Sequence, residues 1–244
     1  MSGQQPGEAR PDQVGPAEFR PRLGAPLLPP AERVRLACQS RSETDYFFGY
    51  WSALGWTLLT FGIYSFYVVY QLVRRMRDHN ARRLELLSAS LSFAWDEATK
   101  RGLQEELTPT FQRAAWNLGG LNDMTGDFRE PLVWVVLSFI ARTVADIVLF
   151  VLLDQDLVRH DEAEVTVEED LALIYARLGQ PIPSPDRDRV KDRHNYVGRT
   201  VATVFSFGIY LFWWYYDVMA EPNRHFRSDW LQEDAMAGAV QALG

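Results

Sequence analysis

Residues 46–73 decide the class of this protein: they read YFFGYWSALGWTLLTFGIYSFYVVYQLV and contain no Asp, Glu, Lys or Arg. As one helix this stretch would be about 42 Å long at 1.5 Å per residue. The hydrocarbon core of a bilayer is roughly 30 Å thick, so such a helix could cross it with some tilt. We therefore predict a transmembrane helix here, with a buried helix of a soluble core as the alternative.

A second uncharged stretch, TVATVFSFGIYLFWWYY at residues 200–216, contains the same tetrapeptide as the first. Phe-Gly-Ile-Tyr occurs at 61–64 and again at 207–210, a shift of 146 residues that also aligns His79 with His225. Identities at a fixed shift indicate an internal repeat. The same shift aligns four further pairs: Tyr50 with Tyr196, Thr57 with Thr203, Phe66 with Phe212 and Tyr70 with Tyr216. We predict two repeat-related transmembrane helices.

A third apolar run, PLVWVVLSFIARTVADIVLFVLL at residues 131–153, is interrupted by Arg142 and Asp146. Two central charges cost about 5–7 kcal/mol on insertion, and the apolar residues return about 4.5–9 kcal/mol, so the run is a marginal span. The charges are four residues apart, which places them on one helical face where they can pair. They form either a structural ion pair or part of a polar pathway.

The composition divides the chain into six segments and predicts an all-α membrane protein. The two repeat-related helices and the marginal third one are accompanied by amphipathic helices and a disordered N-terminal tail. One amphipathic face carries Val167, Leu171, Ile174 and Leu178 before Gly179 ends its helix. The segments are a Pro-rich tail (1–32), a first membrane repeat (33–83), amphipathic helices (84–130), a middle membrane helix (131–153), an acidic helix with a Pro linker (154–191), and a second repeat with a C-terminal helix (192–244).

Charge flanking the two repeats gives conflicting topologies. Lys and Arg are more frequent after the first apolar stretch, where Arg74, Arg75 and Arg77 lie, and before the second. By the positive-inside rule, both ends of the connecting segment belong in the cytoplasm. Either residues 131–153 dip into the membrane without crossing, or they cross. If they cross, the Lys and Arg residues beside one of the two repeats lie on the side that the positive-inside rule disfavours.

Each apolar stretch has a polar stripe at helical spacing, and these stripes are our candidate functional residues. Polar side chains in lipid turn toward other helices, so we expect the stripes to face each other or the middle helix. Gly62 and Gly208 lie beside them and mark a close helix contact, a kink, or a break whose half-helix ends could bind a solute. The candidates are Thr57, Thr60, Tyr64, Tyr67 and Gln71; Arg199, Thr203, Ser206, Tyr210, Trp213 and Asp217; and Arg142 with Asp146.

The remaining signals argue against other classes of function. The sequence contains no catalytic motif, and it has no basic patch of the kind that binds nucleic acid. Cys38 is the only cysteine, which excludes an internal disulfide or thiolate metal site. His79 and His225 could bind a metal or haem, but no second ligand pair is spaced near either one, so hydrogen-bonding roles are favoured and we predict no metal or cofactor. His160 and its acidic neighbours fit a cation site or a solvated acidic turn.

TFGIYSFYVVY and SFGIYLFWWYY, the second followed by EPNRHFRSDWLQEDAM, resemble the bacterial membrane family called domain of unknown function 4234. The likeness covers about a third of the chain, residues 46–80 and 192–236. Ser206 stands where the pattern has Thr, and Val68 where it often has Trp. The resemblance implies a bacterial integral membrane protein and no particular chemistry.

We therefore expect a multi-pass protein of the bacterial inner membrane, non-enzymatic, that acts as a packing or interaction module. The alternative is a small-solute or ion pathway between the two repeats. Expected partners are the lipid bilayer and either another protein or a second copy of the chain, and not nucleic acid.

Overall fold

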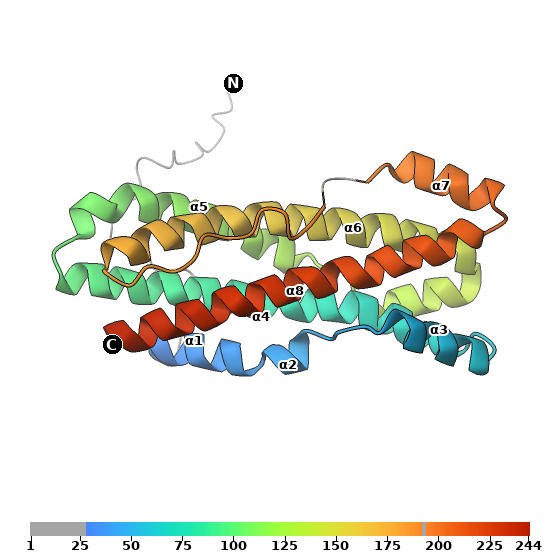
Figure 1. Ribbon diagram of the computed structural model, residues 1–244, viewed down its shortest axis with the longest axis horizontal. Helices are drawn as coiled ribbons and strands as arrows, with labels where there is room; N and C mark the ends of the chain where they lie inside the picture. The colour runs from blue at the N-terminus through green and yellow to red at the C-terminus, as the bar shows by residue number, and fades with distance from the viewer. Residues whose placement is uncertain (1–27, 192–193) are drawn as a thin grey trace, which may run out of the picture.

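The computed structural model describes residues 28–191 and 194–244, and this part of the chain is helical throughout, with no strand (Figure 1). Most of the predicted Pro-rich tail lies outside the described residues, but its end, from Pro30, is helical. The helices are α1 (Pro30–Gln39), α2 (Arg41–Thr44), α3 (Tyr50–Leu59), α4 (Tyr64–Lys100), α5 (Gln104–Gly126), α6 (Pro131–Arg177), α7 (Tyr196–Phe205) and α8 (Ile209–Leu243).

Both copies of Phe-Gly-Ile-Tyr are turns between antiparallel helices. Phe61 and Gly62 have φ of 50° and 91°, and Phe207 and Gly208 have φ of 52° and 88°. Positive φ does not continue a right-handed helix, so α3 and α7 end there and the chain reverses. The prediction of two continuous transmembrane helices is therefore wrong, and each stretch is a helical hairpin.

The apolar part of α6 also folds back, at Ala141, whose φ of −137° and ψ of 51° are non-helical. Ser138 Oγ lies 2.9 Å from Asp146 Oδ1, although residues eight apart in a straight helix are separated by about 12 Å. Arg129 likewise pairs with Asp156 across the fold. By length and composition, α6 is the one helix of the described residues that could cross a membrane, but its apolar part is a third hairpin.

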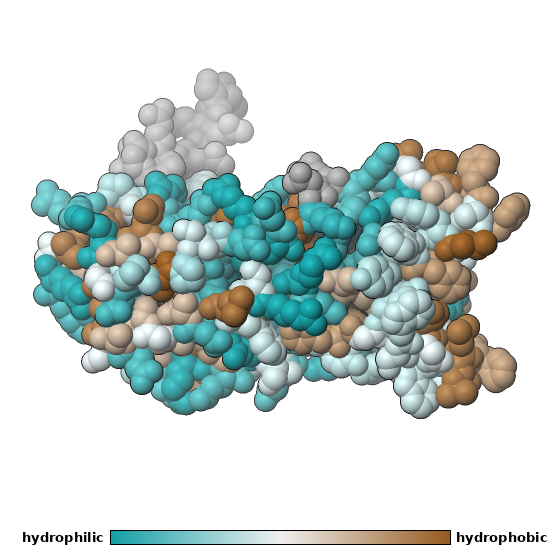
Figure 2. Space-filling view, in the orientation of Figure 1, coloured by the Kyte–Doolittle hydropathy of each residue, from teal (hydrophilic) through white to brown (hydrophobic). Residues whose placement is uncertain are grey.

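The three hairpins lie at one end of an elongated molecule, and we call this region the apolar end: residues 50–73, 131–153 and 196–216 (Figure 1). Figure 2 shows large apolar side chains gathered on its surface. Phe61 and Phe207, at two of the turns, are each 98% exposed. Aromatic side chains this exposed at chain reversals are not stabilised by packing within the protein.

The rest of the molecule is a polar-surfaced bundle formed by α1, α5 and the distal parts of α4, α6 and α8. Its core contains Leu87, Phe111 and Met236, from three of these helices. The predicted face of Val167, Leu171, Ile174 and Leu178 is confirmed, because all four are buried and Gly179, with φ of 84°, follows the helix end. The first part of the predicted amphipathic segment 84–130 is the continuation of α4, which ends at Lys100, and not a separate helix.

Candidate functional site

The hydroxyl groups of the two predicted stripes build the hairpin turns. Thr60 Oγ1 accepts a hydrogen bond from Tyr64 N at 3.0 Å, and Ser206 Oγ accepts one from Tyr210 N at 2.9 Å. The hydroxyls one turn earlier also bond locally, since Thr57 donates to Ala53 O and Thr203 donates to Arg199 O. Each stripe bends at its turn, and the local backbone satisfies its hydroxyls. Of the two predicted arrangements, the one in which a stripe faces the middle segment agrees with Thr57, which lines a cavity together with Arg142 and Asp146.

Further along the stripes, the polar side chains bond within their own hairpin. Gln71 Nε2 donates to Tyr67 OH at 3.0 Å, and Trp213 is exposed. Arg199 pairs with Asp217 at 2.8 Å and joins α7 to α8. The Arg199–Asp217 pair thus joins the two arms of its hairpin, whereas Gln71 and Tyr67 bond within one arm.

Arg142 and Asp146 come together with residues of the other hairpins. A cavity of about 250 Å³ is lined by Arg142, Asp146, Thr57, Ser65 and Tyr215, among others. Arg142 Nη2 donates to Ser65 Oγ at 2.5 Å, whereas Asp146 accepts from Ser138. The predicted direct pair between these two charges is not formed, because the turn at Ala141 directs each to a different partner.

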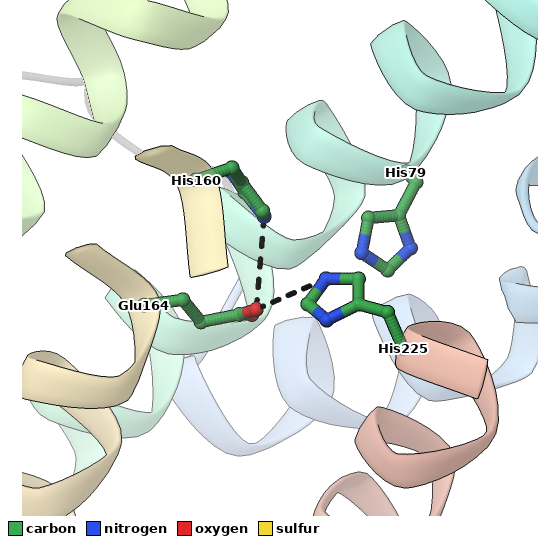
Figure 3. A group of neighbouring side chains, drawn as sticks. All are labelled: His79, His160, Glu164 and His225. Atoms are coloured by element: carbon green, nitrogen blue, oxygen red, sulfur yellow. Dashed lines mark ion pairs between the residues drawn. The ribbon is translucent and has the colours of Figure 1, made fainter. Parts of the chain in front are cut away.

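A buried cluster of three histidines and one carboxylate occupies the middle of the bundle, and we call it the histidine cluster: His79, His160, Glu164 and His225. One nitrogen or oxygen of each lies within 4.8 Å of those of the others. Figure 3 shows the side chains converging from α4, α6 and α8. His160 and Glu164 are one turn apart on α6, so both face the same neighbouring helices.

The outer nitrogens of two histidines face carboxylates. His79 Nδ1 lies 3.0 Å from Asp45 Oδ1, and His225 Nδ1 lies 3.2 Å from Asp161 Oδ1. Their Nε2 atoms both point to Asp229 Oδ2, at 3.3 Å for His79 and 3.2 Å for His225. The carboxylate on Nδ1 orients each ring, so that the two Nε2 atoms face the same Asp229 oxygen.

Several polar atoms of this region are buried without a hydrogen bond. Both ring nitrogens of His160 have none, nor do Nε2 of His79, Nε2 of His225 or Oδ2 of Asp229. His160 Nε2 is 3.7 Å from Glu164 Oε2, beyond hydrogen-bond range. A buried polar group without a partner costs about 1–3 kcal/mol, so this concentration calls for a physical explanation.

Arginines contact the carboxylates throughout this layer, including those that face the imidazoles, since Arg82 pairs with Asp45 and Arg189 with Asp161. Arg83 pairs with Glu164 and Glu168, and Arg189 pairs with Glu168 and Asp229. No guanidinium contacts the three imidazole rings among the ion pairs of the described residues. Six carboxylates and three arginines are buried here: Asp45, Asp161, Glu164, Glu168, Asp229 and Glu233, with Arg82, Arg83 and Arg189.

The environment separates the proton affinities of these groups. Burial would lower the pKa of His79, but the carboxylates of Asp45 and Asp229 outweigh it and raise this pKa to about 9. Burial lowers the pKa of His160 to about 3, so its imidazole is neutral. Burial and the adjacent Glu164 carboxylate raise the pKa of Glu168 to about 8. A proton on His79 thus offsets part of the excess negative charge.

A second group, Asp154, His194 and Glu221, lies nearer the apolar end and contains one histidine instead of three. Both ring nitrogens of His194 face carboxylates, Asp154 at 3.0 Å and Glu221 at 3.2 Å. This histidine is satisfied by the protein itself.

Sequence reasoning identified the histidines separately but did not bring them together. The available signal was the spacing of four in His160–Glu164 and His225–Asp229, with His79 at the position equivalent to His225. No family model, curated protein or solved structure matches this chain. The resemblance to domain of unknown function 4234 stays a prediction.

Proposed function

We propose that this is a bacterial inner-membrane protein that inserts its apolar end into one leaflet and acts there as a non-enzymatic packing or interaction module. The exposure of Phe61 and Phe207, each 98%, carries the proposal. Large exposed apolar patches mark binding surfaces, and here the patch covers three hairpin turns at one end. The helical bundle beyond it has a polar surface, as Figure 2 shows.

The length of the hairpins supports insertion into one leaflet. α3 and α7 have 10 residues each, which corresponds to a depth of about 15 Å, half of the roughly 30 Å hydrocarbon core. Backbone turns at this depth need internal hydrogen bonds. The hydroxyls of Thr60 and Ser206 supply one bond at each turn.

Insertion by hairpins also removes the conflict in the charge signals. Both flanks of a hairpin lie on the same side of the membrane, so Arg74 and Arg77 after the first apolar stretch and Arg187 before the last all lie on the bundle side. The positive-inside rule then places the bundle in the cytoplasm.

Flotation with phospholipid vesicles tests this proposal. Each inserted phenylalanine contributes about 1.5–3 kcal/mol, so F61S/F207S should reduce vesicle binding at least tenfold. The matched control is L231S, because Leu231 is 74% exposed on the polar bundle. Equal binding by both variants would contradict the proposal. So would a wild-type chain that stays in solution as an oligomer with its apolar ends covered.

The cavity beside Arg142 favours a second function, a small-solute or ion pathway at the apolar end. Its guanidinium and the Asp146 carboxylate line a space of about 250 Å³ that all three hairpins enclose. Charges at this depth are costly unless they serve a partner or a pathway. Proteoliposomes carrying R142Q should then lose the ion or solute flux of the wild type; no flux in the wild type would exclude this function.

A further inference from the structure

We propose that the histidine cluster binds one divalent transition-metal ion, with His79, His160, His225 and Glu164 as ligands. The proposal rests on groups in the polar bundle and is independent of membrane insertion. Three imidazoles with one carboxylate match the ligand sets of Zn²⁺, and imidazole also suits other first-row metals.

The unpartnered nitrogens are the observation that points to an ion. His160 is 2% exposed, and neither of its ring nitrogens has a hydrogen bond. A merely structural histidine in this position would leave two buried polar atoms unsatisfied. A metal bound to Nε2 gives His160 a partner. The Nε2 atoms of His79 and His225, which make no hydrogen bond and lie 3.3 Å and 3.2 Å from Asp229 Oδ2, would bind the same ion.

The surroundings match those of a metal centre in two further ways. Asp45 and Asp161 face the Nδ1 atoms of His79 and His225, the outer-shell arrangement that orients metal-binding imidazoles. Six buried carboxylates outnumber three buried arginines in this layer, although each carboxylate contacts a guanidinium. A bound dication would offset part of this excess of negative charge.

The geometry requires only a small contraction. The four ligand atoms lie within 4.8 Å of one another, and tetrahedral bonds of about 2 Å separate ligand atoms by roughly 3.3 Å. Asp229 Oδ2, close to two of the imidazole nitrogens, is placed to accept a further bond or to replace Glu164.

Titration of the metal-free full chain in detergent with Zn²⁺ alone tests the site. The wild type should bind one equivalent, and H160L should bind at least 100-fold more weakly. H194Q is the matched control, because His194 is satisfied by Asp154 and Glu221 and should leave binding unchanged. D45N, which removes the carboxylate that faces His79 Nδ1, should weaken binding about 10–100-fold.

Two measurements keep the test decisive if a variant folds poorly. Co²⁺ added to the wild type should give the intense visible bands of a four-coordinate site. Without metal, H160L should be at least as stable as the wild type, since it removes an unpartnered imidazole. The proposal is overturned if the wild type shows no saturable binding of Zn²⁺ or Co²⁺, or if H160L binds Zn²⁺ as tightly as the wild type.

Discussion

At the scale of single residues, Arg75 compensates for a proline inside α8. Pro222 lacks an N–H, so the carbonyl of Val218, four residues earlier, has no helical donor. Arg75 Nη2 donates to this carbonyl at 2.8 Å, and Nη1 donates to Asn223 Oδ1 at 3.0 Å. Burial lowers the pKa of this guanidinium to about 9. The hydrogen bond to the Val218 carbonyl offsets part of the free energy that burying this cation costs.

This relation predicts a coupled pair of substitutions. R75M should lower the free energy of unfolding by about 1–3 kcal/mol, because it leaves the Val218 carbonyl unsatisfied. In a P222A background the restored N–H of residue 222 satisfies that carbonyl, so R75M should cost less. Denaturant unfolding of the four chains measures the coupling. Equal costs in both backgrounds would show that Arg75 acts independently of the proline.

His194 predicts a pH dependence of stability. Hydrogen bonds to Asp154 and Glu221 raise its pKa from 6.5 to about 9, although Lys191 and Arg224 also approach Glu221, at 4.0 Å and 3.7 Å. A raised pKa means that the folded state holds the proton more tightly. The stabilisation is therefore complete below about pH 6.5 and is lost as the pH rises through about 9.

H194Q should reduce this dependence, and His79, whose pKa is also raised to about 9, should account for part of what remains. Unfolding in denaturant between pH 6 and pH 10 should show a decline for the wild type that is shallower for H194Q. L231S serves as the control, since Leu231 is exposed and distant from any histidine contact. If H194Q and the wild type decline in parallel, His194 is not the titrating group.

At the scale of elements, the hairpin turns require a backbone conformation that their phenylalanines disfavour. Phe61 and Phe207 have φ of 50° and 52°, a conformation that costs roughly 1–2 kcal/mol for a residue with a side chain. Both rings are exposed, so nothing within the protein offsets this strain. We infer that the phenylalanines are retained for contact with lipid.

F61G/F207G should therefore separate stability from membrane binding. In detergent, unfolding should require about 2–4 kcal/mol more, about 1–2 kcal/mol for each turn, because glycine adopts positive φ without strain. Vesicle binding should fall, as for the serine variant. A loss of stability in detergent would mean instead that the rings pack against the protein.

The comparison of sequence and structure is most instructive at these turns. The absence of charge predicted helices correctly, and the 3.6-residue period predicted the buried face from Val167 to Leu178. Hydropathy did not detect the reversals, because Phe-Gly-Ile-Tyr is as apolar as the helices it separates. Gly62 and Gly208 were the local signals of a break. Ala141 gave no such signal, so the third hairpin could not be predicted.

The histidine cluster was missed for a different reason. The spacing of His160 and Glu164 is visible along one helix, but their distance to His79 and His225 depends on how α4, α6 and α8 pack. Periodicity identifies the face of each helix and contains no information about which faces meet. One amino-acid sequence therefore predicts pairs of candidate ligands along a helix, but it does not predict the histidine cluster that these pairs form together.

At the scale of the whole molecule, the three hairpins predict that every polar element lies on one side of the membrane. Three exposed positions on separate helices of the bundle report this: Leu36 on α1, Trp116 on α5 and Leu231 on α8. The native thiol is a poor reporter, because burial raises the pKa of Cys38 to about 11. Single cysteines at these positions in a C38A background avoid this problem.

In intact cells, a membrane-impermeant maleimide should label none of L36C, W116C and L231C, and in inverted vesicles it should label all three. F207C should stay unlabelled in both, since its position is at the tip of an inserted hairpin. A chain that crossed at its first apolar stretch would place residues 36 and 116 on opposite sides, and the two cysteines would then label in different preparations. That outcome would show spanning helices in place of the hairpins. Labelling of all three cysteines in inverted vesicles, and of none in intact cells, would establish a protein embedded from the cytoplasmic side.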